Sequence, residues 1–371
     1  METLSPVLKR TLIGPIEPNL LRPRKILSPV RTEKALLNVG VIGYGYWGPN
    51  VVRNFNSTEG ARVVAICDKD PEGLKRAARM NPGISTVSSD DEILKSPDID
   101  VVAVVTSVST HYPLARRALE NGKHIFVEKP FTASAAEAES LIEIAAKRNL
   151  KIMVDHTFLF TGAVRKIKEL ISGGSLGNIF YYDSTRVNLG LFQHDVNVVW
   201  DLAPHDFAIM NYLIDERPEY ISAYGRSHYN HLEDIAYITL HFNSNIVAHF
   251  SVNWISPVKI RNVLIGGEKK MLVWDDISED EKIKVYDKGV DINSKQGMYD
   301  IMFHYRTGDV LAPHINRTEA LKLECEHFIQ CILNDKSPVS DGAAGLEVVR
   351  MLEACAKSIH DNGRMVKVYD A

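Results

Sequence analysis

An aspartate and a histidine four residues apart could together perform acid–base chemistry. Asp201 and His205 belong to the segment Trp200-Asp-Leu-Ala-Pro-His-Asp206, and residues four apart share one face of a helix. A carboxylate beside an imidazole orients the ring and raises its basicity, so His205 could remove a hydroxyl proton. Because a helix tolerates proline only in its first turn, Pro204 predicts that His205 lies near the helix start. The alternative is that Asp201 caps the helix and His205 is incidental.

A glycine-rich segment could hold the phosphates of a dinucleotide. Gly43, Gly45 and Gly48 are spaced G-x-G-x-x-G, between an apolar run at residues 36–42 and a helix-compatible stretch at residues 50–55. In this context the first glycine permits a tight turn, the second leaves room for a pyrophosphate and the third lets the helix pack closely. A glycine-rich turn without a ligand is the competing interpretation.

An aspartate about 20 residues beyond these glycines supports the dinucleotide interpretation. Asp68 closes the apolar run that begins at Arg62, where a dinucleotide-binding fold places the carboxylate that binds the ribose hydroxyls. An anion here repels a 2′-phosphate, so NAD is favoured over NADP. The other interpretation is a turn aspartate at a strand end.

A lysine could act on the same hydroxyl group. Lys129 lies in Glu128-Lys-Pro130, directly after another predicted strand. Partial desolvation and the positive nicotinamide of an oxidised cofactor would both lower the pKa of Lys129, which could then hold or relay a proton. Pro130 disfavours a helical backbone at the lysine. An ion pair at the surface is the alternative.

Alternating strands and helices position these residues. The predicted strands are continuous apolar runs at 36–42, 62–68, 100–106, 124–128 and 151–155. Such runs, separated by helices, are typical of a parallel sheet covered on both faces, which binds ligands at the carboxyl ends of its strands. Besides the three glycines and Asp68, we therefore expect cofactor contacts from Tyr44, Tyr46, Trp47, Thr106, Ser107, His111, Glu128 and Lys129.

Beyond residue 156 the strands alternate apolar with polar residues, which indicates an antiparallel or mixed sheet with one freer face. A free face suits subunit contact. We predict three parts: an N-terminal extension at 1–35, an α/β NAD-binding Rossmann domain at 36–155, and an α+β domain at 156–371. The last part would carry a large, mostly antiparallel open sheet that serves substrate binding and oligomerisation. The proline-rich, basic extension is either a mobile tail or an arm on a neighbouring subunit.

Composition excludes several other classes of protein. Of 371 residues, 45% are hydrophobic and 24% charged, and the net charge of −4 gives no electrostatic basis for binding nucleic acid. The four cysteines are scattered without a CxxC pair, so we expect reduced residues in a cytoplasmic protein. No apolar run reaches about 18 residues and no signal-peptide core is present, so we expect no membrane span. We also expect no metal site, because His205 lacks further ligands at a matching spacing.

The motifs together resemble the glucose–fructose oxidoreductase / inositol dehydrogenase / rhizopine catabolism (Gfo/Idh/MocA) family. The resemblance rests on GYGYWGPN, Asp68, THYPLARRALENGKHIFVEKP and WDLAPHD. It implies a Rossmann domain followed by a sheet-rich substrate domain that often assembles through its sheet, so we expect a homodimer or homotetramer. The segments Arg186-Val-Asn188 and Asp195-Val-Asn197 are most similar to the branch that oxidises nucleotide-linked sugars at C3, such as UDP-N-acetylglucosamine-type 3-dehydrogenases.

The resemblance also implies roles for individual residues. Lys129, Asp201 and His205 match the catalytic Lys, Asp and His of the family, and Gly43, Gly45, Gly48 and Asp68 match its cofactor positions. In the expected reaction His205 takes the hydroxyl proton, Lys129 stabilises the alkoxide and Asp201 orients His205, while NAD accepts the hydride.

Substrate contacts are expected from polar residues that precede the helix of His205. These candidates are Arg186, Asn188, Gln193 and Asn197, beside Lys129 and His205 themselves. Arg186 suits a carboxylate or phosphate, although an exposed strand and loop would look the same in sequence. The alternatives in function are an inositol or polyol dehydrogenase, a sugar 3-ketoreductase and a non-catalytic NAD-binding protein.

Overall fold

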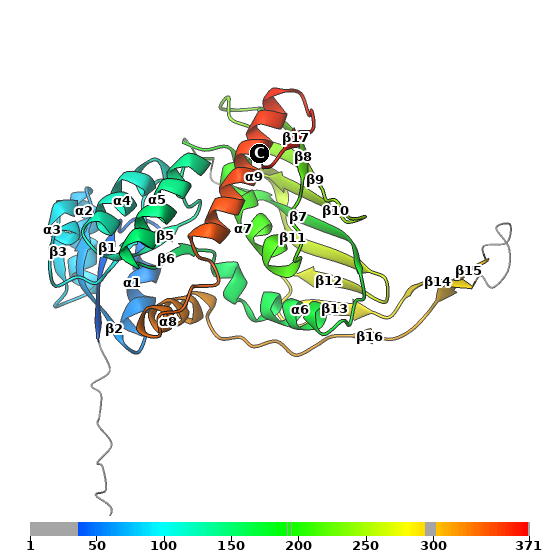
Figure 1. Ribbon diagram of the computed structural model, residues 1–371, viewed down its shortest axis with the longest axis horizontal. Helices are drawn as coiled ribbons and strands as arrows, with labels where there is room; N and C mark the ends of the chain where they lie inside the picture. The colour runs from blue at the N-terminus through cyan, green and yellow to red at the C-terminus, as the bar shows by residue number, and fades with distance from the viewer. Residues whose placement is uncertain (1–35, 191, 194, 294–301, 370–371) are drawn as a thin grey trace, which may run out of the picture. The chain divides into compact units, whose positions relative to one another are not determined.

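The computed structural model describes residues 36–190, 192–193, 195–293 and 302–369 of the chain. The predicted N-terminal extension therefore lies outside the described residues. Figure 1 shows the arrangement of the described elements, which include two larger sheets and the helices that pack on them. In that part of the chain, no helix combines the length and the apolar character that a membrane span needs.

The first sheet is six-stranded and parallel, with the order β3-β2-β1-β4-β5-β6. Its strands are β1 (Leu37–Ile42), β2 (Ala61–Cys67), β3 (Ser85–Val87), β4 (Val101–Val104), β5 (His124–Glu128) and β6 (Ile152–Asp155). Every residue of β4 and β6 is buried, as expected for strands covered on both faces. The order reverses between β1 and β4, which is the place where dinucleotide-binding sheets hold their ligand. The predicted parallel sheet is confirmed.

Helices connect these strands, and two of them begin at a residue whose side chain caps the helix. They are α1 (Gly48–Asn56), α2 (Pro71–Met80), α3 (Asp90–Leu94), α4 (His111–Glu120), preceded by the short η1 (Val108–Thr110), and α5 (Ala135–Arg148). The carboxylate of Asp70 accepts hydrogen bonds from Glu72 N and Gly73 N at the start of α2, which satisfies two of the unpaired amides of the first turn. Ser134 caps α5 in the same way.

The second sheet has nine strands in the order β16-β13-β12-β11-β7-β10-β9-β8-β17. They are β7 (Ile179–Leu189), β8 (Tyr220–Arg226), β9 (Ile235–His241), β10 (Val247–Asn253), β11 (Ile255–Gly267), β12 (Met271–Asp275), β13 (Ile283–Tyr286), β16 (Val310–Leu311) and β17 (Val366–Lys367). Strands β7 and β10 run parallel, and the other paired neighbours run antiparallel. A separate hairpin joins β14 (Gly289–Asn293) to β15 (Met302–Arg306).

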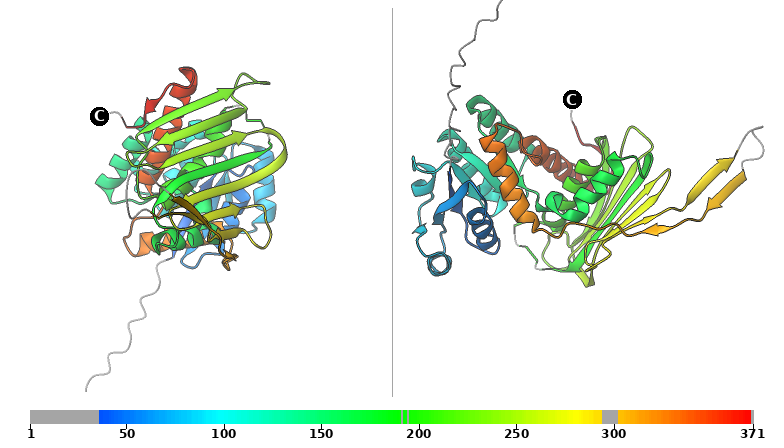
Figure 2. Two further views of the ribbon diagram at one scale, coloured as in Figure 1. Left: turned by 90° about the vertical axis from the view of Figure 1, so that its right-hand side faces the viewer. Right: turned by 90° about the horizontal axis from the view of Figure 1, so that it is seen from below.

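One face of the nine-stranded sheet is covered and the other is open, as the alternation predicts. In β10, Ala248, Phe250 and Val252 are buried, whereas the residues between them are partly accessible. The left view of Figure 2 looks onto the open face, with no helix drawn in front of it. The covered face meets α6 (Gly162–Ser172) and α7 (Val198–Leu213). The predicted mostly antiparallel open sheet is confirmed.

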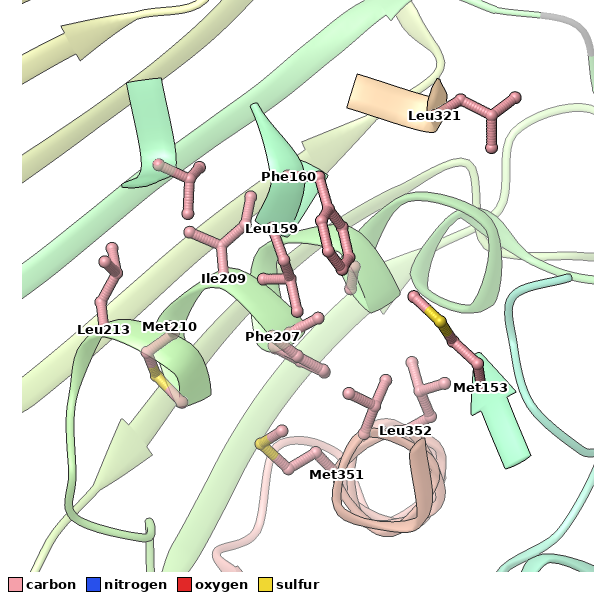
Figure 3. Close-up of a cluster of buried hydrophobic side chains, with 14 of the residues drawn as sticks. Met153, Leu159, Phe160, Phe207, Ile209, Met210, Leu213, Leu321, Met351 and Leu352 are labelled. Carbon is pink, nitrogen blue, oxygen red and sulfur yellow. The ribbon is translucent and has the colours of Figure 1, made fainter. Parts of the chain in front are cut away.

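The last helices return to the first sheet. Phe328 of α8 (Ala320–Leu333) lies 6.1 Å from Phe126 of β5, which also meets Phe55 of α1 at 5.4 Å between ring centres. Figure 3 shows Met153 of β6 in one apolar cluster with residues of α7, α8 and α9 (Gly342–His360). The two sheets therefore share a continuous core. The boundaries proposed at residues 35/36 and 155/156 remain predictions.

We expect Phe328→Ala to destabilise the protein strongly. Removing a buried aromatic ring from a packed core costs about 3–5 kcal/mol, and Phe328 is fully buried. The matched control is Gln330→Ala, which changes an exposed residue of the same helix. Denaturant titration followed by circular dichroism should show a lower midpoint for Phe328→Ala alone. Equal midpoints for the two variants would mean that α8 is not part of this core.

Candidate active site

A large pocket opens at the carboxyl ends of the parallel strands. Its volume is about 800 Å³, and it runs from Asp68 after β2 to Lys129 after β5 and Asp201 of α7. Nine of the twelve residues expected to contact a cofactor line it: Gly43, Gly45, Tyr46, Trp47, Asp68, Thr106, Ser107, Glu128 and Lys129. The other three, Tyr44, Gly48 and His111, do not line it.

The glycine turn has the space that a pyrophosphate needs. Gly43 adopts a φ of +103°, and a Cβ there would lie 2.0 Å from the carbonyl oxygen of Val105. A Cβ at Gly48 would lie 2.4 Å from the carbonyl oxygen of Gly43. These two glycines are required by packing. By contrast, a Cβ at Gly45 would meet nothing within 4 Å and would project into open space beside the pocket, so the residues present fit a dinucleotide phosphate.

Tyr44 supports this turn from behind. Its side chain is buried, its hydroxyl accepts a hydrogen bond from Asn81 (2.9 Å), and its backbone N–H donates to Asp68 Oδ2 (2.5 Å). Arg76 of α2 donates to the Tyr44 carbonyl oxygen (2.6 Å) and lies over the Tyr44 ring. Arg76 could not be predicted from a local motif, because it lies 32 positions from its partner Tyr44.

Asp68 is fixed by the backbone on both sides. Oδ1 accepts from Asp70 N (2.8 Å), while Oδ2 accepts from Tyr44 N. The carboxylate still lines the pocket, and each of its oxygens has a second lone pair. It can therefore accept hydrogen bonds from ribose hydroxyls.

His111 links two loops of the site and does not face the pocket. Its buried ring lies 2.8 Å from the carbonyl oxygen of Pro130 and 2.9 Å from that of Thr106. Burial lowers the pKa of His111. The ring therefore holds the end of β4 against the loop that carries Lys129. Both ring nitrogens have internal partners, and the cofactor contact expected from His111 stays a prediction.

Lys129 and Asp201 meet at one end of the pocket. The Lys129 ammonium donates to the Asp201 carbonyl oxygen (2.9 Å) and to Oδ1 (3.2 Å). Trp254 Nε1 donates to the other carboxylate oxygen of Asp201 (3.1 Å). Both oxygens are thus engaged, and Asp201 orients Lys129. The expectation that Asp201 orients His205 is wrong, because no hydrogen bond joins the two and the ammonium takes the carboxylate.

His205 lies deeper in α7 than expected. The helix begins at Val198, so Pro204 is in the second turn and not in the first. The cap is Asn197, whose side-chain oxygen accepts from Trp200 N (3.0 Å), so Asp201 is not the cap either. Because proline has no N–H, the Trp200 carbonyl loses its helical partner, and the helix tolerates this locally.

The imidazole of His205 is neutral in this structure. Burial, and then the positive charges of Lys129 and Arg186, hold its pKa well below the usual value. The ring packs edge-on against Phe158, 5.0 Å between centres. Nδ1 is buried and has no hydrogen-bond partner among the described residues. His205 is within electrostatic range of Lys129 but is not one of the residues that line the pocket.

Of the expected substrate contacts, two are used for structure. Arg186 is buried in an ion pair with Asp206, with Nε to Oδ2 at 2.7 Å and Nη2 to Oδ1 at 3.0 Å. Asn197 caps α7 and donates to Glu233 (2.8 Å). Both side chains thus have internal partners, and the substrate contacts expected of them stay predictions.

The remaining candidates lie apart from one another. Gln193 lines the pocket beside Asp195 and Val196, whereas Asn188 on β7 does not. Arg261 on β11 is the cross-strand neighbour of Arg186. It was not among the residues predicted from the sequence. Its nearest carboxylate is that of Asp276, at 3.6 Å. Only the pairing of β7 with β11 brings the two arginines together.

Comparison with known proteins identifies the family. A model described as "Oxidoreductase family, NAD-binding Rossmann fold" matches residues 37–156, and one described as "Oxidoreductase family, C-terminal alpha/beta domain" matches residues 168–368. The chain belongs to the Gfo/Idh/MocA oxidoreductase family. It is an NAD-binding oxidoreductase.

Relatives within this family include two dehydrogenases of known substrate. The chain is 29% identical to scyllo-inositol 2-dehydrogenase (NAD(+)) of Bacillus subtilis over 85% of this chain and 91% of the relative. It is 25% identical to UDP-N-acetylglucosamine 3-dehydrogenase of Acidithiobacillus ferrooxidans over 84% and 94%, respectively. A solved structure of the latter enzyme has a TM-score of 0.75, with 22% identity, and covers 88% of this chain and 99% of that one.

A solved complex shows the same fold with a bound cofactor. Levoglucosan dehydrogenase with NADH and L-sorbose has a TM-score of 0.76 at 20% identity, and the match covers 90% of this chain and 99% of that chain.

Within the described ranges, no group of three or more His, Cys, Asp or Glu residues is arranged as a metal-ion site.

Substitution of Gly45 should separate cofactor binding from folding. We expect Gly45→Ala to keep its thermal midpoint but to bind NAD at least about tenfold more weakly, a loss of about 1.4 kcal/mol, because the new methyl group occupies the phosphate space. Gly43→Ala, with its Cβ against Val105, should lower the thermal midpoint. Calorimetric titration and thermal unfolding measure the two effects. Unchanged NAD affinity in Gly45→Ala would place the phosphates elsewhere.

Proposed function

We propose that this protein oxidises a hydroxyl carbon of a nucleotide-linked sugar and transfers its hydride to NAD. The carbon that we propose is C3 of the sugar. The observation that carries the proposal is the meeting of Lys129 and Asp201 at one end of a pocket whose other end is formed by Asp68 and the glycine turn. The similarity to UDP-N-acetylglucosamine 3-dehydrogenase spans most of both chains and supports the choice of substrate.

Lys129 and His205 divide the work on the hydroxyl group in this proposal. When bound, NAD supplies the hydride acceptor, and the C–H bond breaks with its electron pair. Lys129 hydrogen-bonds the sugar oxygen and stabilises the negative charge that develops on it. The O–H proton passes to His205, whose Nδ1 has no hydrogen-bond partner among the described residues and whose lowered pKa favours the neutral ring. The products are a ketone, NADH and one proton.

Asp201 and Trp254 hold the lysine in place. The indole N–H fixes one carboxylate oxygen while the other accepts from the ammonium. The side chains of Lys129 and Asp201 are 16% and 21% exposed, so water screens this ion pair less than a surface pair. A lysine held at fixed direction supplies position as well as charge.

An inositol or polyol dehydrogenase is the second candidate. The identity to scyllo-inositol 2-dehydrogenase, 29% over 331 residues, favours it. Both candidates use the same lysine, aspartate and histidine, so only substrate turnover separates them. Reaction in the reverse direction, as a 3-ketoreductase, is tested with the same enzyme and NADH.

The open face of the nine-stranded sheet supports a further part of the proposal, a homo-oligomer built through this sheet. Exposed apolar and aromatic side chains on it include Tyr181, Tyr224, Tyr237 and Val247. A face of this kind in a monomer marks an interaction site.

The four cysteines are buried and free, in keeping with the proposed cytoplasmic location.

Replacement of His205 or Lys129 should remove catalysis and leave cofactor binding intact. We expect His205→Ala and Lys129→Met to lower kcat by about 10²–10⁴-fold, the usual contribution of a positioned acid or base. Their affinity for NAD should change little. The matched control is His360→Ala, at the exposed end of α9. Steady-state rates with UDP-sugars and inositols, and NAD titrations, give the two readouts. Wild-type turnover in His205→Ala would remove this residue from the mechanism.

A further inference from the structure

Three carboxyl groups, two of them buried and one half-buried, lie together at the Lys129 end of the pocket. Glu128 and Asp155 end neighbouring strands, β5 and β6, and are paired in register. Glu324 comes from α8, which lies much further along the chain. Asp155 is 2% exposed and Glu324 is not exposed at all. Only Glu128 reaches the pocket wall. Three carboxylates in such a place require compensation, since burying an isolated charge is costly.

The hydrogen bonds satisfy two of the carboxyls but leave Glu324 without a well-aligned donor. Trp47 Nε1 donates to Asp155 Oδ2 (2.8 Å), and the Thr157 hydroxyl donates to Oδ1. Glu128 accepts from the backbone N–H of Lys129. Neither oxygen of Glu324 has a partner of hydrogen-bond geometry among the described residues; the groups beside it are the Asp155 carboxyl and the Thr157 hydroxyl, whose proton points to Asp155. Two carboxyls side by side favour a proton on one of them, because an ionised pair has only acceptors.

The charges around the cluster are unbalanced. Glu128 faces Asp155, Lys129 and Asp201, and the ammonium of Lys129 is already paired with Asp201. Burial, and then the neighbouring Asp155, raise the pKa of Glu128 to about 8. Burial also raises the pKa of Asp155 and, further, that of Glu324. These shifts favour a protonated carboxyl in the cluster at neutral pH.

We propose that binding of the oxidised cofactor expels a proton from the Glu128–Asp155–Glu324 cluster, so that the cluster distinguishes NAD⁺ from NADH. The inference rests on the proposed function, which places the nicotinamide at the Lys129 end of the pocket, where Glu128 forms part of the wall. The oxidised ring is positively charged and the reduced ring is neutral. A positive charge beside Glu128 favours the ionised carboxylate, whereas a neutral ring does not.

The sign of the pH dependence follows from this exchange. A proton that leaves on binding makes NAD⁺ bind more tightly as pH rises, by at most about tenfold per pH unit for each proton released. The effect should fade as pH rises past about 8, the pKa to which burial and Asp155 raise Glu128, because Glu128 is then ionised in the free protein. Affinity for NADH should stay nearly constant over the same range. After hydride transfer the positive charge is gone, and the cluster takes up a proton again.

The test is calorimetric titration of the full-length protein with NAD⁺ and with NADH at neutral pH. Titrations in phosphate and in Tris, whose ionisation enthalpies differ, give the number of protons released. We expect close to one proton for NAD⁺ and close to none for NADH. Glu128→Gln should release less than half as much, because its amide can still accept from the backbone N–H of Lys129 but has no proton to lose beside the pocket. The control Glu326→Gln changes a partly exposed carboxyl of α8, 3.9 Å from Lys322, and should match the wild type.

Equal proton release with the two cofactors, or wild-type release in Glu128→Gln, would overturn the inference while the proposed function stands. Failure of both cofactors to bind would instead refute the proposed function, and the inference with it. If Glu128→Gln does not fold, the comparison of NAD⁺ with NADH on the wild-type protein still decides the question.

Discussion

The ion pair between Lys129 and Asp201 is the contact on which the site depends. The lysine follows a strand of the parallel sheet, and the aspartate belongs to a helix that covers the nine-stranded sheet. Asp201 holds Lys129 in position through one carboxylate oxygen. Its other oxygen accepts a hydrogen bond from Trp254, which lies between β10 and β11 of the nine-stranded sheet. The pair therefore connects the part of the chain that binds the cofactor to the part proposed to bind the sugar.

The apolar core makes this contact possible. Met153 of the first sheet packs among residues of α7, α8 and α9 (Figure 3). The last two of these helices are far along the chain but lie against the first sheet. A closely packed core of this kind resists displacement of its parts, so the lysine and the aspartate are held at a fixed separation. The same packing brings Glu324 of α8 against Asp155.

The sequence predicted what short-range patterns determine. Apolar runs of the right length located the strands of the parallel sheet, and the spacing of Gly43, Gly45 and Gly48 located the phosphate turn. The partners of Asp201 and Arg186 were not predictable, because they come from residues more than 15 positions away. Pro204 predicted a helix start that is too late in the sequence. A proline in the second turn of α7 is tolerated because packing stabilises the helix. Glu324 carries no motif, and its importance appears only once α8 is folded onto the sheet.

The most direct measurement of the central claim follows the hydride itself. The purified protein would be incubated with NAD and with UDP-N-acetylglucosamine carrying deuterium at C3 of the sugar, and the reduced cofactor would be analysed by mass spectrometry. The account predicts NADH that contains the deuterium, together with a 3-keto sugar nucleotide. Unlabelled NADH from this substrate, or turnover confined to inositols, would contradict it.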